Sequence, residues 1–382
     1  MSEFIRGQTR IPPRNQSVGF EEWLNLHKVA ESECYTYGLY SKEFEKRLAE
    51  FVGAKFCLLT NSGSSANLLA VTALTQKELG ARRLRPGDEV ITTALSFPAT
   101  VNPIVQNGLV PVFVDVELPY YVPDYVAVHN SIVINYFLGN PVKGITPDWA
   151  VLDMCDAINK GCHCGAMSTY SFYPAHHIST GEGGAVCTDD PLLYKLMLSL
   201  RDWGRDCHCE PGQDNACGHR FDGDYDHKYT YSRIGYNLQM TEMQAALGVA
   251  QMDKLPGFIA HRKRLFKHYY DGLKDLEHIF WLPEATPGSD PAWFGFPLTF
   301  REARDTQAFC RALDEKGIGN RRMFAGNITR QPAYQDVNYR IIGDLMNTNW
   351  IMDNGFWLFL SPTITDEMAD YVIEVLHELS RL

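Results

Sequence analysis

The sequence has no long apolar segment, no run of basic residues, no internal repeat and no low-complexity linker. No stretch approaches the roughly 18 consecutive apolar residues of a membrane-spanning helix, and the polar segment from Met1 to Val18 lacks the apolar core of a secretion signal. Acidic residues number 46 and basic residues 35, so the formal net charge is −11, which disfavours nucleic acids and anionic membranes as partners. We therefore expect a soluble globular protein of the cytoplasm.

The ten cysteines are spaced too unevenly for the disulfide framework of a secreted protein. Three of them, Cys207, Cys209 and Cys217, form a Cys-x-Cys-x7-Cys cluster, which in a reducing compartment indicates a metal or iron–sulfur site. Zinc is the chemical rival of iron, although Cys-x-Cys is tighter than the usual zinc spacing. Four other cysteines are expected to be small buried apolar residues: Cys34, Cys57, Cys187 and Cys310.

Strand and helix patterns alternate over the first two-thirds of this 382-residue chain, which predicts a wound α/β sheet. A helix should follow residues 61–65 and stop near Gly80. A second helix should begin at Thr241, whose pairing with Gln244 is a capping-box pattern, and should break at Pro256 before a further helix over 258–276. The expected strands are 56–60, 89–93, 110–116, 132–137, 150–153 and 185–188.

The chain is long enough for two domains. We expect a large domain over residues 1–255, which includes the N-terminal arm and the sheet. A smaller C-terminal domain over 256–382 should contain a β-rich region at 281–298 and a terminal helix over 366–382.

Three features are suited to binding a phosphorylated ring cofactor. Gly63, Ser64 and Ser65 lie where a strand turns into a helix, so free backbone N–H groups there can bind a phosphate, although a simple helix N-cap is the alternative. Asp153 ends an apolar strand, where its carboxylate can pair with a ring nitrogen or lie in an exposed loop. Phe97 can stack on a ring or belong to the core.

Five segments together resemble the DegT/DnrJ/EryC1/StrS aminotransferase family, over about residues 37–266. In that family a lysine precedes a Gly-rich strand and binds pyridoxal phosphate covalently, whereas His176 stands at this position here. Imidazole cannot form an imine with the cofactor aldehyde, so the resemblance implies a cofactor held by non-covalent contacts and dehydration in place of transamination. The segments are 60–67, 85–91, 107–116, 173–177 and 234–237.

His176 combined with the cysteine cluster is similar to the iron–sulfur 3-dehydrases of the family, the CDP-4-keto-6-deoxy-D-glucose 3-dehydrase type. This resemblance implies the fold-type-I aminotransferase architecture, with a mostly parallel sheet in the large domain and a smaller α+β domain. It also implies a homodimer with its active sites at the subunit interface. The implied reaction uses pyridoxamine phosphate (PMP) to remove the C3 hydroxyl of a nucleotide-activated 4-keto-6-deoxyhexose, with electrons from an NADH-dependent flavin iron–sulfur reductase.

The resemblance also assigns roles to single residues. His176 would take the proton from C4′ of the cofactor, with His177 as an alternative, because a histidine pKa near neutrality suits a general base. Ser65 and Ser171 would contact the phosphate, and Asn237 would reach the phosphate of the neighbouring subunit. Phe97 would stack on the ring. Asp153 would hold the pyridine nitrogen, and Asp156 would lie near the ring hydroxyl.

A [2Fe–2S] cluster would be held by Cys155, Cys207, Cys209 and Cys217 in this family. Cys162 and Cys164 depart from the family pattern, and they can replace Cys155, bind a second metal or occur by chance. Three rival functions remain. One is a PMP-dependent 3-dehydratase without a cluster, and another is a non-catalytic relative with a structural zinc site. The third, a true sugar aminotransferase, would need a lysine at position 176.

Overall fold

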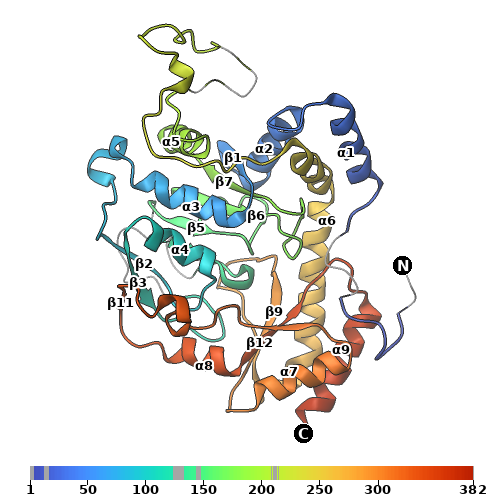
Figure 1. The fold of residues 1–382 in the computed structure, drawn as a ribbon. Helices are drawn as coiled ribbons and strands as arrows, with labels where there is room; N and C mark the ends of the chain where they lie inside the picture. The colour runs from blue at the N-terminus through green and yellow to red at the C-terminus, as the bar shows by residue number, and fades with distance from the viewer. Residues whose placement is uncertain are drawn as a thin grey trace.

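The computed structural model describes residues 4–12, 17–123, 133–142, 148–207, 209, 213 and 215–381. Its centre is a wound α/β sheet, which confirms the predicted fold class (Figure 1). Five strands lie in the order β1 (Phe56–Thr60), β7 (Gly184–Thr188), β6 (Met167–Ser171), β5 (Val151–Asp153) and β4 (Val133–Asn135).

The sheet is mostly parallel, as expected. In the five-stranded part only β7 runs against its neighbours, β1 and β6. Strand β4 contacts β2, which begins a parallel three-stranded continuation. That continuation consists of β2 (Glu89–Thr93), β3 (Val110–Val114) and β11 (Arg340–Ile341), so a strand from the C-terminal region completes its edge.

Most of the predicted strands are confirmed, and one strand of the five-stranded sheet was missed. The ranges 56–60 and 89–93 agree with β1 and β2, whereas β3 and β4 end two residues before their predicted ends. Strand β6 has the sequence Met-Ser-Thr-Tyr-Ser, which lacks an apolar run. Its hydroxyl groups are satisfied internally, because Tyr170 donates to Ser168 at 3.0 Å and Thr169 donates to Asn67 at 2.5 Å. Polar residues can therefore occupy a buried strand here.

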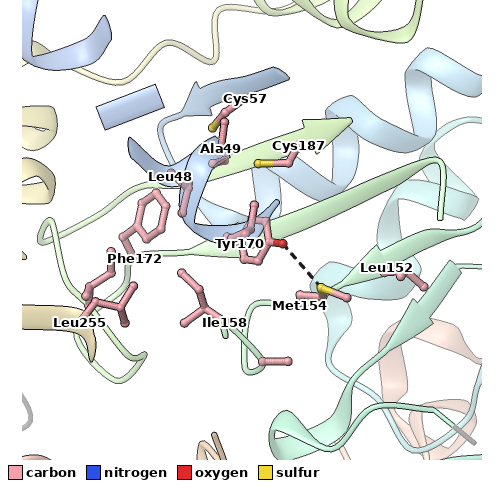
Figure 2. Packing of buried hydrophobic residues seen from close by; sticks show 14 of the residues in the cluster. Leu48, Ala49, Cys57, Leu152, Met154, Ile158, Tyr170, Phe172, Cys187 and Leu255 are labelled. Carbon is pink, nitrogen blue, oxygen red and sulfur yellow. Dashed lines mark hydrogen bonds between the residues drawn. The ribbon is translucent and has the colours of Figure 1, made fainter. Parts of the chain in front are cut away.

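Helices cover both faces of the five-stranded sheet. One face packs against α3 (Gly63–Leu74) and α5 (Pro191–Arg201), and α4 (Pro98–Gln106) lies beside β3 and β4. On the opposite face Leu48 and Leu255 pack with Leu152, Tyr170 and other buried side chains, as Figure 2 shows. The helices of that side are α1 (Phe20–Ser32), α2 (Leu39–Val52) and the long helix α6 (Glu242–Leu273).

The C-terminal region forms a second layer with its own apolar core, which includes Leu298, Phe356 and Leu376. Its antiparallel sheet has the order β10 (Asn320–Arg322), β12 (Gly355–Phe359), β9 (Gly295–Phe300) and β8 (Phe280–Trp281). Its helices are α7 (Thr306–Glu315), α8 (Met346–Asn354) and α9 (Asp366–Ser380), and α9 begins at the predicted residue. Short 3-10 helices occupy Lys77–Arg82, Phe137–Gly139, His227–Tyr229, Lys274–Leu276, Ile328–Arg330 and Pro332–Tyr334.

Helix α6 confirms one sequence prediction and corrects another. The capping box between Thr241 and Gln244 is present, but Pro256 lies inside a continuous helix of 32 residues and does not end it. An internal proline costs a helix about 3 kcal/mol. Burial of Leu255 on one side of Pro256 and of Leu265 and Tyr269 on the other offsets this cost, since these side chains enter two different cores. The division into domains at residue 255 stays a prediction.

Helix α3 also ends earlier than predicted, at Leu74, and a separate 3-10 helix over Lys77–Arg82 contains Gly80, the predicted stop. Among the described residues, none of the helices combines the length and the apolar character needed to span a bilayer.

Two glycines of α6 give a matched test of the packing between α2 and α6. A Cβ at Gly248 would overlap the ring of Phe44, whereas a Cβ at Gly257 would meet nothing within 4 Å. Gly248→Ala should therefore lower the free energy of unfolding, because overpacking costs about 1–3 kcal/mol. Gly257→Ala should raise it by up to about 1 kcal/mol through helix propensity. Urea unfolding of both variants measures the difference, and equal stabilities would contradict the packing.

Candidate active site

A cavity of about 630 Å³ lies at the carboxyl ends of the central strands, facing the C-terminal layer. Asn135, Asp153 and Ser171 are the last residues of β4, β5 and β6, and all three line it. Ligands of open α/β sheets bind at this edge, so the position is that of a functional site. The cavity wall also includes Gly63, Ser64, Phe97, Asp156 and His176, which were predicted to meet the cofactor. Cys155, which was predicted as a cluster ligand, lies on the same wall.

The carboxylate of Asp153 is buried and held by three donors. Its Oδ2 accepts hydrogen bonds from Nδ2 of Asn67 at 2.8 Å and from Oγ1 of Thr100 at 2.6 Å. Its Oδ1 accepts from the amide of Cys155 at 3.2 Å. Thr169 donates in turn to the amide oxygen of Asn67. The sequence analysis gave no role to Asn67, Thr100 or Thr169. The one signal that could have pointed to them is that each is a polar residue within an otherwise apolar segment.

The N-terminus of α3 is open toward the cavity because Gly63 has no side chain. A Cβ at Gly63 would lie 2.6 Å from Cβ of Ser171 and 3.0 Å from Sγ of Cys155. Glycine therefore allows the helix end to approach β6 and leaves its backbone donors accessible to an anion. Ser65 does not line this cavity. Its amide and hydroxyl both contact Oγ of Ser62, the helix N-cap, at 3.1 and 3.0 Å.

His176 lies on the cavity wall beside a buried carboxyl group. Its Nδ1 is 3.3 Å from Oδ1 of Asp156, but within the described ranges this nitrogen has no partner in hydrogen-bond geometry. Its ring packs against Phe294, and its carbonyl accepts a hydrogen bond from buried Arg262 at 3.2 Å. Burial raises the pKa of Asp156, and the adjacent His176 acts in the opposite direction. The imidazole is thus held on the cavity wall between Asp156 and Phe294.

His177 points into the protein core and does not line the cavity. It is 2% exposed, and its Nε2 lies 2.5 Å from the carbonyl oxygen of Ala292. Burial lowers the pKa of His177 well below its ordinary value, and the nearby Arg262 guanidinium adds to the effect. Of the two adjacent histidines, His176 is therefore the one in reach of a bound molecule.

Aromatic and basic residues from the C-terminal layer complete the cavity. Phe97 is half exposed and meets Phe324 edge to face, with ring centroids 5.9 Å apart. Phe324 has a φ of 50°, which is uncommon for a bulky residue outside functional sites. The lining residues that sequence analysis missed are Phe294, Arg321, Arg322, Phe324, Trp357 and Phe359, and no local spacing relates them to the motifs.

The cysteine cluster lies apart from this cavity. Ligand atoms of Cys207, Cys217 and His227 lie within 4.8 Å of one another. Cys209 is adjacent, since its amide donates to Sγ of Cys207 at 3.4 Å and its Sγ accepts from the amide of Cys217 at 3.3 Å. The structure thus brings three of the four predicted cluster ligands together. Within one chain, Cys155 instead lines the cavity with Asp153.

The remaining cysteines belong to packing environments. Cys162 and Cys164 pack against the core, where their sulfur atoms contact the hydroxyls of Tyr170 at 3.4 Å and Tyr136 at 3.6 Å. Over the described part of the chain, neither joins a group of potential metal ligands. Cys57 and Cys187 are buried, as predicted, and Cys310 is partly buried. The prediction for Cys34 was wrong, because this residue is exposed in the turn after α1.

Asn237 is exposed and does not line the cavity in its own chain. It pairs with Asp202 in an isolated β-bridge, and the next residue, Leu238, accepts a hydrogen bond from the amide of Asn61 at 2.8 Å. The predicted contact of Asn237 with a neighbouring subunit stays a prediction.

Comparisons with known proteins extend these observations to the whole chain. A model of the DegT/DnrJ/EryC1/StrS aminotransferase family matches residues 17–135 and 151–377. Lipopolysaccharide biosynthesis protein RfbH of Salmonella typhimurium is 45% identical, with 98% of this chain and 93% of that protein covered. A dTDP-4-dehydro-2,6-dideoxy-D-glucose 3-dehydratase of Saccharopolyspora spinosa is 44% identical, with coverage of 98% and 87%. The structure of Escherichia coli GDP-4-keto-6-deoxy-D-mannose 3-dehydratase with bound hydrated pyridoxal phosphate (PLP) superimposes with a TM-score of 0.83 at 27% sequence identity. The superposition covers 95% of this chain and 98% of that protein.

The burial of His177 predicts a specific pH dependence of stability. Its pKa is lower in the folded protein than in the unfolded chain, so the unfolded chain binds more protons below about pH 6.5 and stability is lost as pH falls. At about pH 5.5 the loss should reach about 1.4 kcal/mol relative to neutral pH. His177→Gln keeps a donor for Ala292 and should remove this part of the pH dependence.

Urea unfolding of wild type and variant at about pH 7.5 and about pH 5.5 measures the effect. His278→Gln, at an exposed site, is the control and should leave the pH dependence unchanged. An equal acid loss in wild type and His177→Gln would show that His177 is not buried as a neutral ring.

Proposed function

The chain belongs to the DegT/DnrJ/EryC1/StrS aminotransferase family, and from this premise we propose that it is a PMP-dependent 3-dehydrase of a nucleotide-activated 4-keto-6-deoxyhexose. One observation carries the proposal. A histidine, His176, occupies the cavity where a transaminase needs a lysine, and the described cavity wall contains no lysine at all. Histidine can move a proton but cannot hold the cofactor covalently, which favours elimination over amino transfer.

The cavity fits the phosphate, ring and nitrogen of PMP. The open N-terminus of α3 at Gly63 and Ser64, together with Ser171, supplies donors for a phosphate. Asp153, held by Asn67 and Thr100, supplies a fixed carboxylate for a protonated ring nitrogen. Phe97 offers a half-exposed ring for stacking. The hydrogen-bond donors, the carboxylate and the aromatic ring of the cavity therefore suit the phosphate, the ring nitrogen and the ring of PMP.

Bound PMP would supply an amine that joins the C4 keto carbon of the sugar and a ring that withdraws electrons from C4′. The residues of the chain perform the remaining tasks. Asp153 would keep the ring nitrogen protonated, and His176 would remove the C4′ proton as general base. Asp156, whose Oδ1 lies 3.3 Å from Nδ1 of His176, would stabilise the imidazolium that forms and would lie near the ring hydroxyl, as the resemblance implies.

The substrate side of the cavity is suited to an anionic sugar nucleotide. Arg321 and Arg322 bring guanidinium groups to the wall, where they can bind a diphosphate. Phe324, Trp357 and Phe359 provide apolar surface for a sugar ring. The 3-dehydratases among the relatives are named for dTDP- and GDP-linked sugars, which supports the class of substrate without selecting the nucleotide.

A [2Fe–2S] cluster on the segment of Cys207, Cys209 and Cys217 is the second part of the proposal. Replacing a C3 hydroxyl by hydrogen consumes two electrons and two protons and releases water, and elimination supplies no electrons. We propose that an NADH-dependent flavin iron–sulfur reductase supplies these electrons, and that a cluster held by these cysteines would carry them one at a time. Three thiols gathered on one segment fit this donor set. A 3-dehydratase without a cluster would have no use for these thiols, while a zinc site would use them only for structure.

A homodimer is part of the same proposal. The described part of the segment between α5 and α6 extends outward from the layers of the sheet and its helices (Figure 1). Two of its large apolar side chains are exposed, Ile234 to 94% and Phe221 to 77%. We infer that a second copy of the chain covers them. A second copy that covered them would bring Asn237 toward the neighbouring site, as the family resemblance implies.

His176→Asn should retain PMP binding and slow exchange of the C4′ proton by about 10²–10⁴-fold, the usual loss on removing a general acid or base. The measurement is deuterium exchange at C4′ of PMP with a panel of CDP-, dTDP- and GDP-linked 4-keto-6-deoxyhexoses. Borohydride treatment of wild type with PLP should leave no pyridoxyl group on residue 176. Normal exchange in His176→Asn, or a lysine labelled at full occupancy, would refute the assignment.

Cys217→Ser should separate the two half-reactions, because Cys217 does not line the cofactor cavity. We expect loss of iron and sulfide and of the 3-deoxy product, with C4′ exchange largely intact. Exchange, product and iron are measured on the same anaerobic sample, with reductase and NADH supplied, and Cys34→Ser at an exposed site is the control. A variant without iron that formed product at the normal rate would favour the dehydratase without a cluster.

A further inference from the structure

Arg262, on α6, is a buried cation, and among the described residues no carboxylate forms an ion pair with it. It is 2% exposed, and its guanidinium donates to two backbone carbonyls, from Nη1 to Phe294 at 3.0 Å and from Nη2 to His176 at 3.2 Å. Burial lowers the pKa of Arg262 to about 10, and the carboxyl group of Asp156 acts in the opposite direction. A buried charge without a paired carboxylate is costly, which favours a functional reason for its presence.

The two carbonyls that Arg262 holds belong to residues on either side of the candidate base. His176 carries the imidazole, and the ring of Phe294 packs against it with centroids 5.2 Å apart. The guanidinium presents its donors in a rigid planar fork. One side chain therefore fixes the spacing between the backbone of the histidine and the backbone of the aromatic residue that supports its ring.

Arg262 reaches this position because α6 continues past Pro256. Ile259 packs in the core beneath the large sheet, and Leu265 packs in the core of the C-terminal layer, so Arg262 lies between the two cores along the helix. His176 follows a strand of the first layer, and Phe294 directly precedes a strand of the second. The fork thus joins both layers at the candidate base.

We propose that Arg262 is a positioning residue for His176: its two hydrogen bonds fix the imidazole in the cavity, and it acts on proton removal through His176 alone. This inference rests on the proposed function. Arg262 does not line the cavity, so we expect no contact with cofactor or substrate. Its effect on the reaction would come from geometry, since a small misplacement of a reacting group slows a reaction strongly.

Arg262→Lys tests the fork while it keeps the charge. Lysine carries its donors on one nitrogen at the end of a flexible stem, so it cannot hold both carbonyls at their present spacing. We expect C4′ proton exchange to slow by about 10²-fold, the cost of a misplacement of about 1 Å. The dissociation constant of PMP should stay unchanged. Arg264→Lys, at an exposed site two residues further along the helix, is the matched control and should keep both properties.

A double variant separates positioning from general destabilisation. If Arg262 acts through the imidazole, Arg262→Lys should have no further effect on exchange in a His176→Asn background. An equal loss in both backgrounds would overturn the proposal, and so would exchange at the wild-type rate in Arg262→Lys alone. Arg262→Gln, which removes the buried charge and keeps one donor group, takes the place of the lysine variant if that variant does not fold.

A second measurement tests the position of the ring without any turnover. The Hε1 resonance of His176 is recorded in the PMP-bound protein labelled with 13C-histidine, and it is assigned by its loss in His176→Asn. The ring current of Phe294 should shift this resonance in wild type and in Arg264→Lys, and Arg262→Lys should move it toward the value of an exposed histidine. An unmoved resonance would refute the role of Arg262. Absence of C4′ exchange in wild type with every sugar nucleotide tested would instead refute the proposed function, while the resonance would still decide the position.

Discussion

The buried carboxylate of Asp153 is the constraint on which the cavity depends. An ionised carboxylate in a protein interior is costly unless donors surround it, and a hydrogen bond to a charged group contributes about 1.5–3 kcal/mol. The donors here come from Asn67 on α3, Thr100 on α4 and the amide of Cys155 after β5. All of these elements must pack together before the carboxylate is satisfied. The packing of the sheet and helices and the position of the candidate site are therefore set by the same contacts.

The sequence predicted the fold well where one local pattern decided the structure. Apolar runs located β1 and β2, and the capping box located the start of α6. It failed where a distant contact decided the structure. Pro256 remains helical because α6 buries Leu255 and Ile259 in one core and Leu265 in another. Strand β6 forms although its serine and threonine residues give no apolar run. Such compensation lies in tertiary packing and cannot be found in a short window of sequence.

The same division applies to the candidate site. Gly63, Phe97, Asp153 and His176 follow strands or precede helices, and the carboxyl edge of a sheet gathers such positions. Arg321 and Phe324 reach the cavity from a separate layer far later in the chain, with no local signature. The proximity of His227 to Cys207 and Cys217 also has no local signature, because backbone contacts between distant parts of the loop, such as Asp206 with Thr230, bring the histidine close.

The two sites of the proposed enzyme have opposite physical requirements. Proton removal at His176 needs a fixed base in a secluded pocket, and its imidazole is held between Asp156 and Phe294. A centre that receives electrons from another protein needs an accessible position, and the described residues between 207 and 230 project from the layers formed by the sheet and its helices (Figure 1). The requirement is then that association, with a second copy or with a reductase, brings the centre within electron-transfer range of the bound sugar.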